Sequence, residues 1–128
     1  MIDHLFKFTT EADAKNKLSV WVDVNADTSQ AYWKPKPKCG LMPVKIVTQE
    51  AVYNEDSNGD MVLASPEIFL DGWWLAIACE TQDEALWAIP ECVLEVDRNT
   101  SSQTFQYMRT KLSAEIVDTI VRITPTFA

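Results

Sequence analysis

The strongest hydrophobic pattern of the chain lies in residues 72–79, GWWLAIAC, which are apolar almost without interruption. A run of this length is typical of a buried strand, whose side chains point alternately to the two faces of a sheet. Both faces would be apolar, so each needs a cover, and the small alanines of one face leave room for a close neighbour. The two sets are Trp73, Leu75, Ile77 and Cys79 on one face, and Trp74, Ala76 and Ala78 on the other.

Other segments also show the alternating or continuous apolar patterns that predict strands. An Asn58-Gly59 pair between two apolar runs indicates a hairpin turn. The predicted strands cover residues 4–8, 44–53, 61–64 and 92–96.

Two capping boxes predict the starts of short helices. In each, a threonine is followed three residues later by an acidic side chain that can bond back to the first turn. Thr10 is followed by Asp13, and Thr81 by Glu84. The second helix is expected to stop before Pro90, which cannot continue it.

The order of these elements predicts the fold class. With the strand at 61–64 set aside as an insertion, the order is β-α-β-β-α-β, which is that of the ferredoxin-like split motif. We therefore predict an α+β domain over residues 1–98, in which two helices cover one face of an antiparallel sheet.

The C-terminal segment, residues 99–128, has a different pattern. Its apolar residues recur at spacings of three and four, which is typical of an amphipathic helix. We predict this helix over residues 103–123, interrupted near Ser113, as an extension of the domain. It would cover the open sheet face over Trp74, either in its own chain or in a neighbouring subunit. The stripe consists of Phe105, Met108, Leu112, Ile116 and Ile120.

The charge of the chain is unevenly distributed. The 128 residues carry a net charge of −8, and residues 46–97 contain twelve acids with neither lysine nor arginine. Phosphate would be repelled by such a surface, so nucleic acid is excluded as its partner. A basic partner would be attracted, as would a protein that normally binds nucleic acid. The simpler interpretation is an acidic surface that keeps the protein in solution.

No segment resembles a membrane span or a secretion signal. The longest apolar run, residues 73–79, is too short to cross a bilayer, so no membrane partner is expected. The N-terminal residues lack the basic start and apolar core of a signal peptide. An odd number of cysteines favours free thiols in a reducing compartment such as the cytoplasm. These are Cys39, Cys79 and Cys92.

Motifs for catalysis or cofactor binding are missing from the sequence. It has no phosphate-binding glycine loop and no serine nucleophile motif. Residues 54–60, NEDSNGD, match the start of a calcium-binding loop, but Ser65 occupies the position of its final glutamate, so a polar hairpin turn is the better interpretation. A hydrolase in which His4 meets one of the cysteines stays open as a hypothesis. We predict a non-enzymatic protein without metal or cofactor.

Residues 25–41 are expected to form a loop, and its segment 34–38, KPKPK, alternates lysine with proline. The prolines exclude a helix and favour extended backbone. One interpretation is a recognition segment anchored by aromatic residues. The simpler one is an ordered surface loop whose lysines offset the negative charge of residues 46–97, the acidic block. For protein contacts the candidate residues over the whole chain are Trp33, Trp74, Phe105, Leu112, Ile116 and Ile120.

Three short motifs carry a resemblance. The first, F-x-F-x-T-E-x-x-A, precedes a later D-G-[WY]-x-[VL] strand and a short helix that contains E-A-L. The matching positions are Phe6, Phe8, Thr10, Glu11 and Ala14, then Asp71, Gly72, Trp73 and Leu75, then Asp83, Glu84, Ala85 and Leu86. Over residues 4–97 the chain resembles small proteins that tailed bacteriophages and prophages encode near their tail genes. This resemblance implies a virion or assembly role, in the host cytoplasm or the assembled virion, and brings no catalytic residues.

These observations predict a non-enzymatic structural or accessory protein of a phage or prophage tail region. Its partners would be other protein subunits, either copies of itself or particle components. The alternative is an acidic inhibitor that imitates nucleic acid and occupies the binding site of a host defence protein.

Overall fold

The computed structural model describes residues 1–98 and 105–126 of the chain. Within these residues, seven strands form the main sheet, in the order β10-β9-β1-β8-β4-β11, with β7 also paired to β4. Neighbouring strands run antiparallel. The strands are β1 (Ile2–Phe8), β4 (Gly40–Gln49), β7 (Ile68–Phe69), β8 (Trp73–Cys79), β9 (Cys92–Asp97), β10 (Arg109–Thr110) and β11 (Arg122–Pro125).

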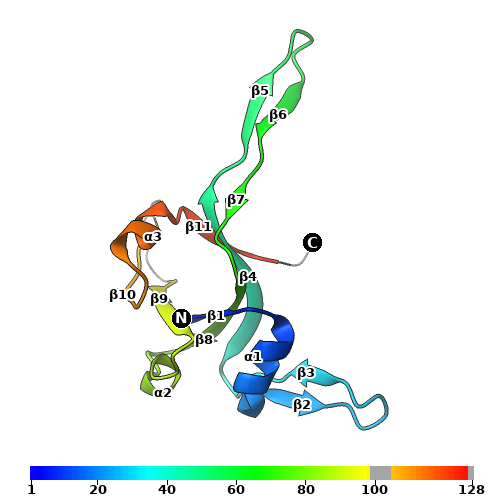
Figure 1. Ribbon diagram of the computed structural model, residues 1–128, viewed down its shortest axis with the longest axis vertical. Coiled ribbons are helices and arrows are strands. Elements are labelled where there is room, and N and C mark those ends of the chain that lie inside the picture. Colours follow the sequence, from blue (N-terminus) through cyan, green and yellow to red (C-terminus); the bar gives the residue numbers. More distant parts are fainter. Residues whose placement is uncertain (99–104, 127–128) are drawn as a thin grey trace.

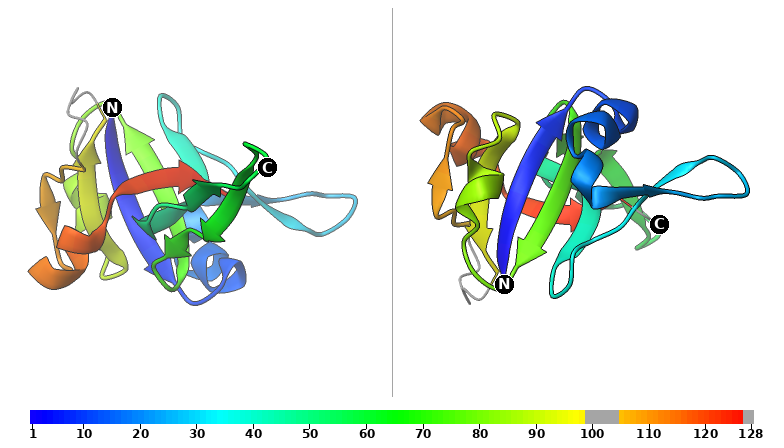
Figure 2. Two further views of the ribbon diagram at one scale, coloured as in Figure 1. Left: turned by 90° about the horizontal axis from the view of Figure 1, so that it is seen from above. Right: turned by 90° about the horizontal axis from the view of Figure 1, so that it is seen from below.

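The sheet is strongly curled. In both views of Figure 2, β11 crosses the face of β1 and β8, on the side opposite α1 (Glu11–Lys17). The sheet therefore has a concave face lined by the C-terminal segment and a convex face that carries helices.

The helices are short and begin at polar caps. The Thr10 hydroxyl accepts a hydrogen bond from the Asp13 amide at 3.1 Å, which confirms the first predicted capping position. The second helix starts later than predicted, because the carboxylate of Asp83, and not the Thr81 hydroxyl, accepts the Leu86 amide. Besides α1 they are η1 (Ser19–Trp21), α2 (Glu84–Trp87) and α3 (Ala114–Thr119).

Two hairpins project from the body, as Figure 1 shows. One consists of β2 (Val22–Val24) and β3 (Ala31–Trp33), and the other of β5 (Val52–Glu55) and β6 (Met61–Ser65). The second is the hairpin predicted from the Asn-Gly pair, and Gly59 takes the positive φ of 84° that its turn requires. Residues 25–41, expected to be a loop, include β3 and the start of β4.

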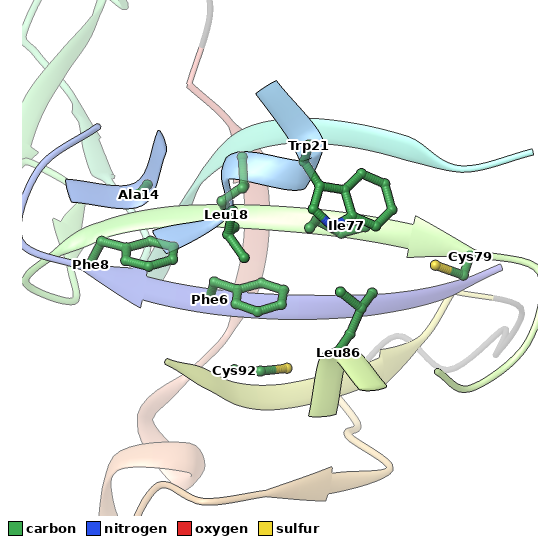
Figure 3. Close-up of a cluster of buried hydrophobic side chains, with 10 residues drawn as sticks. Phe6, Phe8, Ala14, Leu18, Trp21, Ile77, Cys79, Leu86 and Cys92 are labelled. Atoms are coloured by element: carbon green, nitrogen blue, oxygen red, sulfur yellow. The ribbon is translucent and has the colours of Figure 1, made fainter. Parts of the chain in front are cut away.

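The convex face of the sheet is covered by α1, η1 and α2. In Figure 3, the rings of Phe6 and Phe8 lie along β1, and Leu18, Trp21 and Ile77 lie on the same side of the sheet. These residues form one hydrophobic cluster with others from β8 and α2. This face corresponds to the Trp73 side of the apolar run at residues 72–79.

The concave face is covered by the C-terminal segment of the same chain. Trp74, only 2% exposed, packs with Leu5, Val44 and Ile120 in a second hydrophobic cluster. Its indole nitrogen donates a hydrogen bond to the Asp71 carbonyl at 3.0 Å. The sequence left open whether this sheet face is covered by the same chain or by a neighbouring subunit. In the structure, the same chain covers it.

The predicted fold class is wrong. The molecule is mostly β, with a strongly curled antiparallel sheet and helices no longer than seven residues, and not a ferredoxin-like α+β fold. The predicted C-terminal helix over residues 103–123 is also wrong. Of that range, residues 103–104 lie outside the described part, and in the rest β10 and β11 flank a helix of only six residues, which Ser113 caps.

The reason lies in the edges of the sheet. A C-terminal helix would leave the backbone groups of β9 and β4 unpaired along both edges, which is costly for strands of this length. In the structure, β10 pairs with β9 and β11 with β4, so residues on either side of α3 join the two ends of the sheet. Hydrogen bonding across the fold outweighs the helical spacing of the apolar residues.

Candidate protein-interaction surface

The β5–β6 hairpin and its two connections, residues 50–67, form a projection that we call the arm (Figure 1). Within the described part of the chain, β5 and β6 pair only with each other. An isolated two-stranded hairpin is at most marginally stable in water, because nothing covers its faces. The arm therefore depends on its anchor in the body or on a partner.

One face of the arm is apolar and exposed. Tyr53 lies opposite Leu63, and Glu55 lies opposite Met61, so all four side chains share a face. Tyr53 is 56% exposed, Leu63 is 56% exposed and Met61 is 64% exposed. Large apolar side chains grouped on a projecting surface mark an interaction site more often than isolated ones do.

The turn of the arm is held by its own polar groups. One oxygen of the Asp56 carboxylate accepts hydrogen bonds from the Asn58 amide at 2.8 Å and the Asp60 amide at 2.9 Å. This is the predicted polar hairpin turn at the segment that resembles a calcium loop. Asp56 keeps its negative charge while it holds the turn, so three carboxylates, those of Glu55, Asp56 and Asp60, lie at the tip.

An ion-pair cluster fixes the base of the arm. Arg122 on β11 donates from Nε to Glu50 at 2.7 Å and from Nη2 to Glu67. Glu50 and Glu67 lie at the two connections of the arm, so the Arg122 side chain holds both. We call this ion-pair cluster the Arg122 clamp. Hydrogen bonding to Glu50 raises the pKa of Arg122 above its usual value, so the clamp stays charged at all physiological pH values.

The acidic block of residues 46–97 is partly neutralised by the flanking segments. Arg109 forms ion pairs with Glu84 and Glu95, both at 3.0 Å, and Lys17 pairs with Glu91 at 3.3 Å. With the two acids held by Arg122, five carboxylates of the block are paired with cations from outside it. The inhibitor hypothesis stays a prediction, and the tip of the arm keeps its charge.

The second projection, β2–β3, carries two aspartates and is followed by a basic loop. Trp33 on β3 turns inward, where its ring stacks on that of Trp73 with centroids 6.2 Å apart. The loop after β3 carries Lys34, Lys36 and Lys38, and Lys36 lies over the Trp21 ring at 4.9 Å. This segment was predicted either as a recognition element or as a surface loop, and it lies on the surface beside an aromatic cluster.

The sequence-predicted interaction residues divide into buried and exposed groups. Trp74 and Ile120 lie in the core of the concave face, and Trp33, Phe105 and Leu112 are half-buried against the two clusters. Ile116 is the most exposed of the six, at 37%. The structure does not bring these six residues together on one surface.

The exposed face of the arm was missed by sequence reasoning. The predicted fold treats the strand at 61–64 as an insertion, although MVLAS is an apolar run that pairs, in the described part of the chain, only with β5. That mismatch between an apolar strand and the absence of a place for it in the predicted sheet is the signal that could have found the arm.

A buried polar cluster includes the sole histidine. His4 and Glu95 are both fully buried, with His4 Nε2 3.4 Å from a Glu95 oxygen. His4 Nδ1 donates to the Ile77 carbonyl at 3.1 Å, and Nε2 accepts from the Asp83 amide at 3.1 Å. Both ring nitrogens therefore bond to backbone, and the ring anchors the start of α2 instead of activating a thiol.

The three cysteines, all within the described residues, are free thiols. Burial raises the pKa of both Cys79 and Cys92 to about 12, so neither is a reactive thiolate at neutral pH. Cys39 is half-buried, and its sulfur lies 3.5 Å from that of Cys79. The cysteine hydrolase hypothesis finds no activated nucleophile at the two buried sites.

A cavity of about 460 Å³ lies on the concave face, between the sheet and the C-terminal segment. Ala76 forms part of its floor, as expected for the small side chains beside Trp74, and Met42, Val96 and Phe105 line it further. At its rim, Arg98 is paired with Asp3. The C-terminal segment covers this face without filling it.

Comparisons with protein-family models, with curated proteins and with solved structures give no match. In the described part of the chain, no helix has the length and apolar character needed to cross a membrane.

Proposed function

We propose that the chain is a non-enzymatic assembly protein that acts through protein–protein contacts, with the arm as its principal contact element. The observation that carries the proposal is the apolar face of the arm. Tyr53, Met61 and Leu63 each expose more than half of their surface, although they lie side by side. Aromatic residues and methionine are enriched where protein interfaces bury their core.

The construction of the arm supports the same proposal. Its base is fixed by the Arg122 clamp and its turn by the Asp56 carboxylate, so the apolar face is presented in a defined direction. A pre-ordered element loses less conformational entropy on binding than a flexible one does. A hairpin that served only to connect two strands would need neither the clamp nor the apolar face.

We place this assembly role in a phage or prophage tail region, in host cytoplasm or the assembled virion. Support comes from the motifs at Phe6–Ala14 and Asp71–Leu86, which resemble those of small proteins encoded near tail genes. The assembly role itself rests on the arm and stands independently of that resemblance.

Complementation in the encoding phage or prophage tests the proposal. The gene is deleted and supplied in trans as the wild type, as the arm variant Tyr53→Ser/Met61→Ser, or as the control Tyr107→Ser/Met108→Ser. The control changes the same residue types at positions that are also exposed, at 42% and 43%, but lie on the body. Particle yield and incorporation of the chain are measured by infectivity and by mass spectrometry of purified particles.

The wild type and the control are expected to enter particles, and the arm variant to be excluded from them. Normal incorporation of a folded arm variant would show that the arm is not the principal contact element. Particles that form at normal yield without the gene, and that never contain the chain, would refute the tail-region assignment.

A further inference from the structure

We propose that the arm binds the lysine loop, residues 34–38, and the adjacent β2–β3 hairpin of a second copy of this chain, so that copies associate head to tail. This inference rests on the proposed function and names the partner of the arm.

On the arm, the contact surface combines apolar area with negative charge. Glu55 shares its face with Tyr53, Met61 and Leu63, and Asp60 follows the turn. Among the described residues, neither Glu55 nor Asp60 forms an ion pair with a cation. The acidic tip is therefore unneutralised within the chain, in contrast to the acids at the base of the arm.

The surface that receives the arm, residues 34–38 with the adjacent hairpin, carries positive charge in its loop and an exposed aromatic side chain on β3. Residues 34–45 contain four lysines and no acid. Lys34 reaches the Asp23 carboxylate at 3.3 Å, and Tyr32 lies directly opposite Asp23, so these three side chains share the outward face of the hairpin. Tyr32 is exposed on this face, whereas Val24, which is also exposed, points to the other face of the hairpin. The acidic tip of the arm and the basic loop at residues 34–38 are complementary in charge, and Tyr32 beside that loop offers exposed apolar surface to the apolar face of the arm.

The loop that presents the lysines is stiff. Pro35 and Pro37 fix two of its backbone torsions, and the Lys36 ammonium rests over the Trp21 ring. Lys34 and Lys38 are therefore displayed by a segment that has little conformational freedom to lose on binding. This is the segment for which the sequence left a recognition role open.

The arrangement of the two surfaces requires a second molecule. The arm projects at one end of the long axis, whereas β2, β3 and the start of β4 lie at the other end (Figure 1). A chain cannot fold its own arm back over that distance while the Arg122 clamp holds the base. Pairing of two arms about a twofold axis would bring like charges together, so the heterologous contact is favoured, and it continues from copy to copy or closes into a ring.

Reciprocal charge reversal tests this contact. One variant is Glu55→Lys/Asp60→Lys on the arm, a second is Lys34→Glu/Lys38→Glu on the loop, and a third combines all four changes. Asp56 and Lys36 are left intact because they hold the turn and cover Trp21. The control, Glu115→Lys/Asp118→Lys, reverses two exposed charges on α3. Self-association is measured by sedimentation at low salt, and folding is checked by circular dichroism.

The wild type is expected to associate progressively with concentration. Each one-sided reversal should raise the dissociation constant by about tenfold or more, because attraction becomes repulsion. The combined variant should return to within about threefold of the wild type, and so should the control.

Two results would overturn the inference: a wild type that stays monomeric throughout the concentration range, or an association that one-sided reversal leaves unchanged. Neither result bears on the complementation experiment, because that experiment requires only that the arm binds some subunit of the particle. Exclusion of the arm variant from particles, combined with a strictly monomeric chain, would keep the proposed function and remove the second copy as the partner.

Discussion

The two isoleucines around α3 give a direct test of how the C-terminal segment is packed. Ile116 and Ile120 occupy equivalent places in the apolar stripe of the sequence, one helical turn apart. In the structure they differ, because Ile120 is 5% exposed in the core of the concave face and Ile116 is 37% exposed. We predict that Ile120→Ala destabilises the fold far more than Ile116→Ala does.

The magnitude follows from burial. Ile120→Ala removes three buried carbons, each of which contributes about 0.8 kcal/mol, for a total of about 2.4 kcal/mol. The cavity left beside Trp74 and Val44 adds to this, so the free energy of unfolding should fall by about 3 kcal/mol. Ile116→Ala should cost about 1.5 kcal/mol or less, because 37% of this residue already meets water and no closed cavity is left.

Urea unfolding followed by circular dichroism measures both changes, and Ile116→Ala serves as the matched control. Tryptophan fluorescence adds a second reading, since loosening of the cover should expose Trp74 and shift its emission to longer wavelength. Equal losses for the two variants would mean that the C-terminal segment does not pack on its own sheet as described, and would restore the continuous helix as an alternative.

Three further outcomes are expected. Gly72→Ala should cost at least about 1 kcal/mol of stability, because Gly72 has a φ of 113° and a Cβ would lie 2.9 Å from the Lys7 side chain; a thermal melt unchanged from the wild type would contradict this. Iodoacetamide at neutral pH should modify Cys39 in the folded protein and spare Cys79 and Cys92, as peptide mass spectrometry would show; equal labelling of all three would argue against the burial of the last two. Because burial raises the pKa of Cys92 to about 12 while the unfolded chain ionises near about 8.5, stability is complete below that value and should be lost as the pH rises toward 12, by at most about 1.4 kcal/mol per pH unit for this thiol. Urea titrations of the wild type and of Cys92→Ala across this range check the effect, and identical slopes would refute it.

Local signals in the sequence predicted local structure well. The apolar run at 73–79 is the central strand β8, Thr10 caps α1, and Asn58-Gly59 forms the turn between β5 and β6. Each of these depends on interactions between residues close in sequence, such as a capping hydroxyl or a positive φ at glycine.

The assembly of these pieces could not be predicted in the same way. The spacing of Phe105, Leu112 and Ile116 satisfies a helix, yet β10 and β11 form because the edges of β9 and β4 are available to pair with them. Edge availability is a property of the folded sheet and leaves no mark within the segment itself. The same limit applies to the candidate site, since exposure of the arm depends on what the rest of the chain leaves uncovered.

Photochemical cross-linking from the arm tests directly whether the arm contacts a second copy of the chain. Tyr53 is replaced by the photoreactive residue p-benzoylphenylalanine, and this protein is mixed with nitrogen-15-labelled wild type before irradiation. We expect cross-links from the arm to labelled peptides that contain residues 31–38. The label would show that the contact is between two molecules. Cross-links confined to the arm's own chain, or none between copies at concentrations where the wild type associates, would contradict it.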